Sequence, residues 1–429
     1  MARWTLVLAP SLVFGMGLYS GLHSLNTAEE ALPTTIELGK GWPSNIRAVL
    51  EDMQVAAQDL PESALQYAFD HLGGTTTARN ATASFLSWAH ARQTQSSTPV
   101  RAEELLLTYG TQGALAAICN AYFTDGDTVV LEELSYFNAF STCNVAINFV
   151  SAPLDANGMI SIEGLNQTIR SQQEAGAVVR AFYTVPTFHN PTQAVYPGSL
   201  RKQLVQLAMS LDFLIIADEE SELITWPGTT QMPLSMHFYD RDEDSMGGMG
   251  HVISTMSTSK FYSSPGLSVG WILARPARIA NMSVTYSSTA GSPITQALWA
   301  NAIHAGRVAS TYQDIMQDYQ HRATSLRGAL KLPLGSNVKG GTIGGTFLWV
   351  CLPRQYNVTL AFGQSAEVVA QYGVTVYLPR KFEQQGQSAH AYDHCMRLCY
   401  IYLDVPELIA GAARLSNLIA RNASLFGVD

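Results

Sequence analysis

Hydrophobic and polar positions after residue 33 alternate between two kinds of segment. Short runs that are apolar on both faces, such as "VVRAFYTV" at 178–185 and "FLIIAD" at 213–218, are typical of buried parallel strands. Longer segments with apolar residues at helical spacing lie between them, for example "SLRKQLVQLAMSLD" at 199–212. Strands that alternate with helices of this length predict βαβ units and an open, mostly parallel sheet.

The pattern changes after about residue 300. A long helical stretch leads to a glycine-rich turn, "KGGTIGGTFLWVCLP" at 339–353, which begins a second unit of strands and helices. We therefore predict an α/β fold with two domains. A large domain over residues 51–295 carries the mostly parallel sheet, and a small α+β domain is made from both termini, residues 31–50 and 296–429.

Residues 1–30 form a separate apolar segment. From Trp4 to Leu22 the chain is almost wholly apolar and follows a single Arg3, as in a signal peptide or a short membrane anchor. The same composition suits an arm that packs on the protein's own surface or on a partner subunit. Both interpretations stay open, and contact with a membrane is expected only for an anchor.

Composition narrows the range of partners. Charged residues make up 14% of the 429-residue chain, the formal net charge is −9, and no run of Lys and Arg occurs, so we do not expect nucleic acid binding. The five cysteines are scattered and lack the spacing of metal ligands, so we expect neither a disulfide framework nor a metal site. We interpret them as small core residues: Cys119, Cys143, Cys351, Cys395 and Cys399.

Polar residues that suit ligand chemistry follow the predicted strands, at the edge where such sheets bind ligands. In "YGTQGAL" the backbone N–H groups of Gly110, Thr111 and Gln112 can face a phosphate, although many strand-to-helix turns look the same. Asn190 lies in "PTFHNPTQ", where the following proline holds it extended, as it also would in an ordinary turn.

Three charged residues stand in apolar or small-residue surroundings. Asp218 ends "FLIIAD", where a buried carboxylate needs a cationic or hydrogen-bonding partner, unless it caps a helix. Lys260 follows small hydroxyl residues in "STMSTSK", and Arg397 lies inside "HCMRLCYIYLD". A lone lysine is often solvated, but a buried arginine implies an anion, either a structural carboxylate or a ligand.

Taken in order, these residues resemble the site of the fold-type-I pyridoxal 5'-phosphate (PLP) enzymes of the class I/II aminotransferase family. The resemblance runs from Glu37 to the C-terminal region and is densest in "TVPTFHNPT", "LVQLAMSLDFLIIADE" and "GGTFLWVCLP". The segments "IELGKGWPS" and "DEESELITW" are most similar to the fungal branch of aromatic and 2-aminoadipate aminotransferases. This resemblance implies a fold-type-I architecture and PLP as the cofactor.

The resemblance also gives each residue a role. It implies that Lys260 bonds to the cofactor aldehyde and then moves the substrate proton. Asp218 would keep the pyridine nitrogen protonated, and Asn190 would bond the ring hydroxyl oxygen. Arg397 would bind the substrate carboxylate with its two-pronged donor set, beside Gly41 and Asn190.

Further positions would hold the cofactor. Tyr136 falls where the family stacks an aromatic ring on the pyridine. Tyr67 falls where the family reaches across to the phosphate of the neighbouring subunit, which implies a homodimer. The expected phosphate cradle within the subunit is Gly110, Thr111 and Gln112, and Ser257 is an expected cofactor-binding residue among the small neighbours of Lys260 that make room for the phosphate.

Two cofactor positions depart from the family pattern. Ser221 replaces the tyrosine three residues after the pyridine-binding aspartate, and Ser268 replaces an arginine that clamps the phosphate. A serine donates one neutral hydrogen bond where an arginine gives a charged, two-pronged contact, so we expect weaker cofactor binding than is usual.

The expected function is a PLP-dependent aminotransferase that moves an amino group from an α-amino acid to a 2-oxo acid. Two alternatives stay open. One is a PLP-dependent lyase or synthase similar to 1-aminocyclopropane-1-carboxylate synthase. The other is a degenerate homologue with weak or no activity, which Ser221 and Ser268 motivate.

Overall fold

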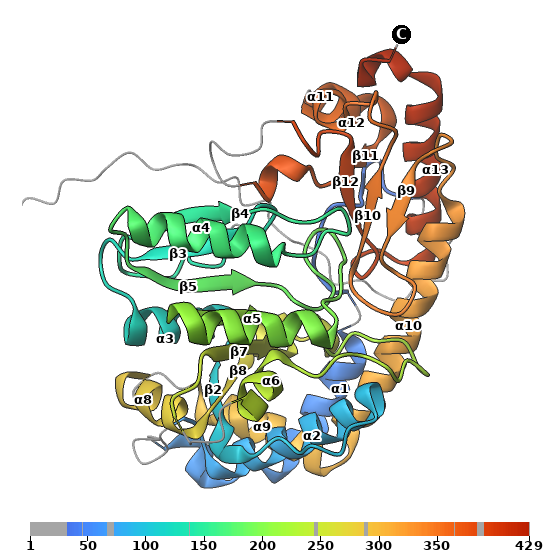
Figure 1. Cartoon of the computed structure of the whole chain (residues 1–429). Coiled ribbons are helices and arrows are strands. Elements are labelled where there is room, and N and C mark those ends of the chain that lie inside the picture. Colours follow the sequence, from blue (N-terminus) through green and yellow to red (C-terminus); the bar gives the residue numbers. More distant parts are fainter. Residues whose placement is uncertain are drawn as a thin grey trace, which may run out of the picture. The chain divides into compact units, whose positions relative to one another are not determined.

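The computed structural model describes residues 32–428 except 45, 67–72, 137, 244–247, 287–290, 364 and 384–389. The chain divides into two units, Met1–Pro33 and Thr34–Asp429, and the description concerns the second unit. Its main element is a seven-stranded sheet of order β2-β8-β7-β6-β5-β3-β4 (Figure 1). The strands are β2 (Leu105–Tyr109), β3 (Thr128–Glu132), β4 (Asn148–Ala152), β5 (Val179–Thr184), β6 (Leu214–Asp218), β7 (Val252–Ser257) and β8 (Val269–Ala274).

Most neighbours in this sheet are parallel. Strands β4, β3, β5, β6 and β7 pair in parallel, whereas β8 runs antiparallel to β2 and β7. The prediction of an α/β fold with a mostly parallel sheet is therefore confirmed. Because parallel strands end at the same edge, the segments that follow β5, β6 and β7 meet there.

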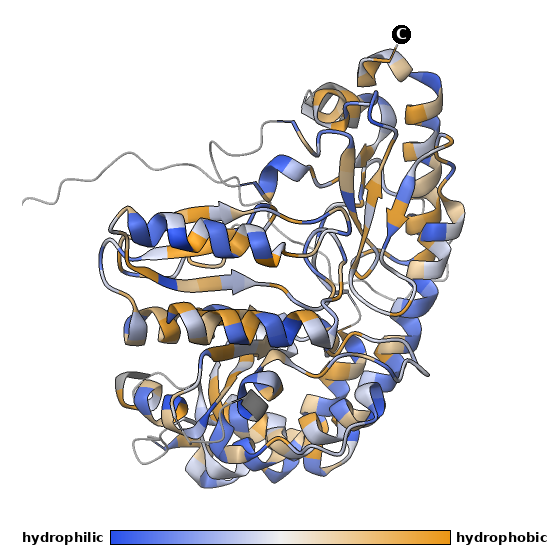
Figure 2. Cartoon of the chain, in the orientation of Figure 1, coloured by the Kyte–Doolittle hydropathy of each residue, from blue (hydrophilic) through white to orange (hydrophobic). Residues whose placement is uncertain are grey.

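Both faces of the sheet are covered, since successive side chains of a strand point to opposite faces. Ala181 and Ile216 pack in one hydrophobic cluster with residues of α3 (Gly110–Tyr122). Phe182 and Ile215 pack in another with residues of α4 (Ile162–Glu174) and α5 (Gly198–Leu211). Figure 2 shows hydrophobic and hydrophilic residues interspersed along α4 and α5, as expected for helices with one face on a sheet.

Further helices belong to the described part of the chain. The α-helices are α1 (Arg47–Ala56), α2 (Thr76–Thr94), α6 (Met236–Glu243), α7 (Thr258–Phe261), α8 (Pro276–Tyr286), α9 (Pro293–His304), α10 (Arg307–Ala329), α11 (Val358–Gly363), α12 (Ser365–Tyr372) and α13 (Val405–Arg421). Short 3-10 helices are η1 (Ala57–Asp59), η2 (Glu62–Leu65), η3 (Ala102–Glu104), η4 (Pro265–Leu267), η5 (Pro379–Lys381) and η6 (Ala423–Phe426).

A second sheet is made of three strands from the late part of the chain. It is antiparallel, with the order β12-β10-β9, and consists of β9 (Asn337–Lys339), β10 (Phe347–Cys351) and β12 (Cys395–Cys399). In addition, β1 (Ile36–Glu37) pairs in parallel with β11 (Val374–Thr375), which joins the first strand of the described chain to a segment late in the sequence. This α+β arrangement agrees with the expected architecture, and the domain boundaries at residues 51 and 296 stay a prediction.

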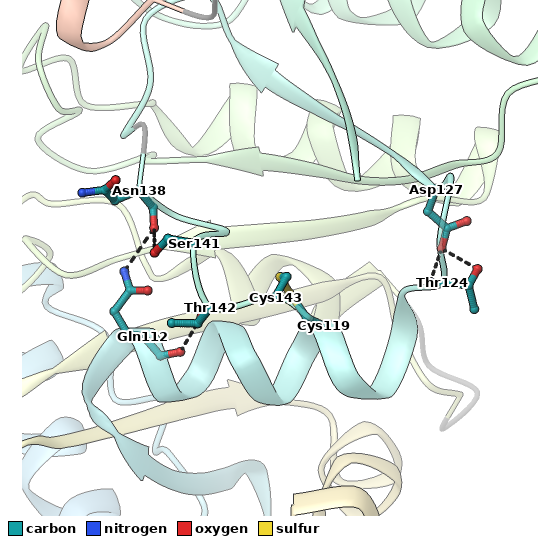
Figure 3. The surroundings of a disulfide bond; sticks show 8 residues. All are labelled: Gln112, Cys119, Thr124, Asp127, Asn138, Ser141, Thr142 and Cys143. Carbon is teal, nitrogen blue, oxygen red and sulfur yellow. Dashed lines mark hydrogen bonds between the residues drawn. A yellow bond between two sulfur atoms is a disulfide. The ribbon is translucent and has the colours of Figure 1, made fainter. Parts of the chain in front are cut away.

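Two disulfide bonds correct the expectation for the cysteines. Cys351 and Cys395 lie directly opposite each other on β10 and β12 and are bonded. Cys119 of α3 is bonded to Cys143 in the loop between β3 and β4 (Figure 3). The expectation of no disulfide was wrong, because strand register and helix packing join cysteines that are 44 and 24 residues apart in sequence. Cys399 is buried and free, as expected of a core residue.

The question of a membrane segment concerns the N-terminal residues. No helix in the described part of the chain is long and apolar enough to cross a membrane. The segment Trp4–Leu22 lies outside the described residues, so its two interpretations stay open.

Candidate active site

Lys260 lies on the one-turn helix α7, directly after β7. The hydroxyl of Ser257 caps this helix by accepting a hydrogen bond from the N–H of Ser259 at 3.2 Å. The Lys260 Nζ donates to the carbonyl of Gly41 at 2.8 Å. Burial lowers the pKa of the Lys260 amine, and the charges of Glu220 and Asp218 oppose that shift. A lysine with a lowered pKa keeps a larger share of its amine neutral, which is the nucleophilic form.

Asp218 is buried at the end of β6. Its carboxylate accepts a hydrogen bond from the Tyr183 hydroxyl at 2.6 Å and from the N–H of Glu220 at 3.2 Å. Burial raises the pKa of Asp218, while the Tyr183 bond and the charge of Lys260 act in the opposite direction. Asp218 is thus a buried carboxylate that a cation or a pyridinium N–H would stabilise.

Arg397 of β12 is buried and has polar and aromatic neighbours. One guanidinium nitrogen donates to Oδ1 of Asn190 at 2.8 Å, and another donates to the carbonyl of Gly39 at 3.0 Å. The guanidinium also lies 3.9 Å from the ring centroid of Phe347. A Cβ at Gly41 would lie 3.4 Å from Nη2 of Arg397, so a glycine lets the segment pass close to the guanidinium.

The charge of Arg397 has no carboxylate partner within the described residues. Burial lowers the pKa of Arg397 to about 10, and its Nε, which is buried, has no hydrogen-bond acceptor in the described structure. A buried guanidinium of this kind is destabilising unless an anion binds it. Its planar donor set matches a carboxylate, so Arg397 and Asn190 form a candidate carboxylate site.

Tyr136 lies in the loop after β3 and is partly buried. Burial raises the pKa of its hydroxyl, and the nearby charges of Asp218 and Glu220 raise it further. The structure therefore brings the Tyr136 side chain close to the acidic end of β6, where the resemblance predicts an aromatic ring beside the pyridine.

The candidate phosphate cradle holds a carboxylate of the chain itself. The Thr111 hydroxyl donates to Glu220 at 2.6 Å, and the Ser257 hydroxyl lies 2.7 and 2.8 Å from its two carboxylate oxygens. Gly110 begins α3 at φ +62°, and a Cβ at Gly270 would lie only 2.6 Å from Cα of Gly110. The backbone of β8 thus packs tightly against the turn, and only glycine fits at position 270.

Gln112 turns toward a neighbouring loop. Its side-chain amide donates to the carbonyl of Asn138 at 3.4 Å, and the main-chain carbonyl of Gln112 accepts from the Thr142 hydroxyl at 3.3 Å (Figure 3). These contacts tie the first turn of α3 to the loop that carries Cys143. The Gln112 side chain is therefore not directed at Glu220, although its backbone N–H belongs to the same helical turn.

Two other predicted cofactor residues, Ser221 and Ser268, make no hydrogen bond with this group in the described structure. The carbonyl of Ser221 accepts from Ile224 N–H at 3.0 Å, and no hydrogen bond of the Ser221 hydroxyl occurs within the described structure. The Ser268 hydroxyl donates to the carbonyl of Pro265 at 3.3 Å, within its own turn. Tyr67 lies outside the described residues.

Sequence reasoning did not select three residues that the structure places in the site. They are Gly39, Tyr183 and Glu220. Tyr183 pairs across β5 and β6 with Ile216, two residues before Asp218, so only the strand register reveals its position. Glu220 had a signal in the sequence, because it is the third of three consecutive acidic residues that begin with Asp218.

The site residues suit the ring of PLP and the substrate, but those at the expected phosphate position include a negative charge. Lys260, Asp218 and Arg397 offer an amine, a carboxylate for a ring nitrogen and a guanidinium for a substrate carboxylate. The hydroxyls of Thr111 and Ser257 suit a phosphate, but both bond Glu220. The ring and substrate parts therefore fit the cofactor, while the phosphate part carries a competing negative group.

Comparison with known proteins identifies relatives of this chain. The family model "Aminotransferase class I and II" matches residues 36–402. Aromatic-amino-acid aminotransferase 1 of Thermococcus litoralis is 27% identical over 328 residues, which cover 75% of this chain and 73% of that protein. The uncharacterized protein YER152C of Saccharomyces cerevisiae is 26% identical over 260 residues, covering 57% of this chain and 58% of that one, which agrees with a resemblance to fungal proteins.

Solved structures show the same fold. The α-aminoadipate aminotransferase LysN of Thermus thermophilus, complexed with N-(5'-phosphopyridoxyl)-L-leucine, superposes with a TM-score of 0.72 at 22% identity. The match covers 91% of this chain and 94% of that one. The fold-type-I architecture is confirmed, and these matches favour neither a lyase nor a non-catalytic protein.

Proposed function

We propose that this chain, which belongs to the class I and II aminotransferase family, uses Lys260 as the catalytic amine of a PLP-dependent aminotransferase. Enzymes of this family move an amino group from an α-amino acid to a 2-oxo acid. The cofactor supplies an aldehyde and an electron-withdrawing ring, and the residues of the chain supply binding, orientation and proton transfer.

Lys260 is the residue on which this proposal depends. Its pKa is lowered by burial, and its Nζ is fixed by the carbonyl of Gly41 at 2.8 Å. In its neutral form an amine can take a proton from one carbon atom and give it to another in the same site. Asp218, buried close enough to affect the pKa of Lys260, is positioned to keep a ring nitrogen protonated.

Arg397 would orient both substrates. An amino acid and a 2-oxo acid share a carboxylate beside the reacting carbon, and the guanidinium of Arg397 is buried without a carboxylate partner among the described residues. Asn190 holds one of its nitrogens at 2.8 Å, and Gly41 leaves room beside another. A substrate carboxylate bound here would bring its α-carbon toward the side of the site where Lys260 lies.

The proposal is tested with Lys260→Ala. We expect loss of the cofactor's covalent attachment and of turnover, because Lys260 is the amine that donates to the Gly41 carbonyl and the variant removes it. Borohydride treatment followed by intact-mass measurement detects attached cofactor. The matched control is Lys202→Ala, an exposed lysine on α5, which should keep both properties. Attached cofactor in the Lys260 variant would refute the assignment.

A homodimer is the second part of the proposal. Three large apolar side chains are exposed in the segment before α1 and in its first turn, namely Trp42, Ile46 and Leu50, with exposed fractions of 59%, 57% and 59%. Ile46 and Leu50 lie one helical turn apart and share a face. An exposed apolar surface of this kind suits contact with a second copy of the chain.

A further inference from the structure

Glu220 bonds the hydroxyl groups that the cofactor phosphate would need. Its two carboxylate oxygens accept from Thr111 at 2.6 Å and from Ser257 at 2.7 and 2.8 Å. Thr111 belongs to the first turn of α3, and Ser257 ends β7, so the carboxylate joins two elements that the sequence predicts to bind phosphate together. Both hydroxyl protons are engaged, since each hydroxyl has one proton to donate.

The charges around Glu220 do not compensate for a phosphate. The groups that face it are Asp218 from the end of β6, Lys260 from α7 and the Tyr136 hydroxyl from the loop after β3. Helix α3 has no charged residue, and neither does β8. At position 268, just before β8, the chain has serine rather than a cation. A phosphate dianion in this cradle would thus meet two carboxylates and one lysine.

We propose that Glu220 occupies the phosphate subsite, and that the cofactor phosphate binds only after Glu220 takes up a proton and gives up its two hydroxyl donors. The inference rests on the proposed function, because it assumes that Thr111 and Ser257 are phosphate ligands. In this step solvent supplies one proton to the Glu220 carboxylate. The Thr111 and Ser257 hydroxyls then turn their protons to the phosphate oxygens. The neutral carboxyl of Glu220 no longer repels the negatively charged phosphate.

Proton uptake gives the step a defined pH dependence. Burial and the charge of Asp218 raise the pKa of Glu220 to about 7, against the bonds from Thr111 and Ser257 and the charge of Lys260. The neutral form of the Glu220 carboxyl group therefore predominates below about pH 7 and becomes scarce above it. Linkage predicts that PLP affinity is reduced about thirtyfold at about pH 8.5 and hardly at all at about pH 6.

The experiment compares wild-type apo-protein with Glu220→Gln in titrations with PLP and with pyridoxal, which lacks the phosphate. We expect PLP to bind Glu220→Gln about thirtyfold more tightly than wild type at about pH 8.5, with a gap below about twofold at about pH 6. Pyridoxal should bind both proteins equally at both pH values. Comparing variants at each pH cancels the titration of the phosphate itself. Glu51→Gln, an exposed glutamate on α1, is the control for net charge.

Each other outcome has a definite meaning. If wild type and Glu220→Gln also differ in their affinity for pyridoxal, or if their difference in PLP affinity does not depend on pH, the substitution acts through Lys260 or the cofactor ring. Either result would overturn the inference. If wild type binds PLP and no gap exists, the inference fails while the proposed function stands. If neither protein attaches PLP or pyridoxal, the proposed function itself fails.

A second measurement, made on the wild-type protein, tests the inference if Glu220→Gln does not fold. Inorganic phosphate, added to wild type together with pyridoxal, should occupy the same cradle more readily at about pH 6 than at about pH 8.5, and Glu220→Ala should remove that difference. Equal phosphate binding by wild type at both pH values would contradict the inference.

Discussion

At the scale of single residues, the site is defined by where charge is buried. Asp218, Lys260 and Arg397 are each held in polar contacts inside an otherwise apolar fold, which requires a partner of opposite charge or a pKa shift. The same rule makes Glu220 notable, because two hydroxyls and no arginine compensate it. Ser268 stands at the position where the resemblance to the family predicts a cation.

We predict that Ser268→Arg tightens PLP binding. Val269 pairs with Tyr109, so the residue before it lies beside the turn at Gly110. A charge-assisted contact is worth roughly 1.5–3 kcal/mol, which corresponds to about tenfold or more in affinity. We expect about tenfold, because Glu220 would attract the same guanidinium. PLP titration of apo-protein measures this, with Ser268→Gln as a long neutral control. Equal affinities for the Arg and Gln variants would mean that another residue holds the phosphate.

At the scale of elements, a buried carboxylate connects the segment before β2 to α6. Glu104, at the end of η3, accepts from the Arg101 N–H at 2.9 Å and from Nη2 of Arg241 at 3.1 Å, and lies 3.3 Å from the His237 ring. Burial alone would raise the pKa of Glu104, but the bonds with His237 and Arg101 prevail and lower it to about 2. The connection therefore depends on an ionised carboxylate.

We predict that this contribution is lost in acid. The pKa of Glu104 is depressed in the folded state, so its stabilisation is present above about pH 4.5 and disappears as the pH falls toward 2. A shift of this size corresponds to roughly 3 kcal/mol. Urea unfolding should show Glu104→Gln less stable than wild type at neutral pH, with the difference shrinking in acid. Glu103→Gln, whose side chain is 58% exposed, should change the free energy of unfolding by less than about 0.5 kcal/mol. A difference that stays constant with pH would contradict the explanation.

At the scale of the whole molecule, strand ends from the large sheet and the segment around residues 39–41 meet at one site. Lys260 follows strand β7 of the large sheet, whereas Arg397 belongs to β12 of the second sheet. The carbonyl of Gly41 accepts a hydrogen bond from Lys260, and the carbonyl of Gly39 accepts one from Arg397. One early segment of the chain therefore contacts both the proposed catalytic amine and the proposed substrate-binding cation. Disulfide bonds fix one helix to a loop and one pair of strands within this arrangement.

We predict a homodimer that uses the exposed start of α1. Sedimentation should give twice the chain mass, and the double variant Ile46→Asp, Leu50→Asp should weaken association at least about tenfold, because it places charges in an apolar contact. Val284→Asp, at a position that is 70% exposed on α8, is the matched control. A fully active monomer at all concentrations would contradict the prediction.

The sequence by itself determined the alternation of strands and helices, the parallel sheet and the choice of Asp218, Lys260 and Arg397. These follow from local periodicity and from the free-energy penalty for isolated charges in apolar segments. Only the tertiary structure decided that Tyr183 bonds Asp218, that Glu220 bonds Thr111 and Ser257, and that four cysteines pair. Those contacts depend on strand register and on the packing of helices against the sheet, which join residues far apart in sequence and leave no periodic signal in the chain itself.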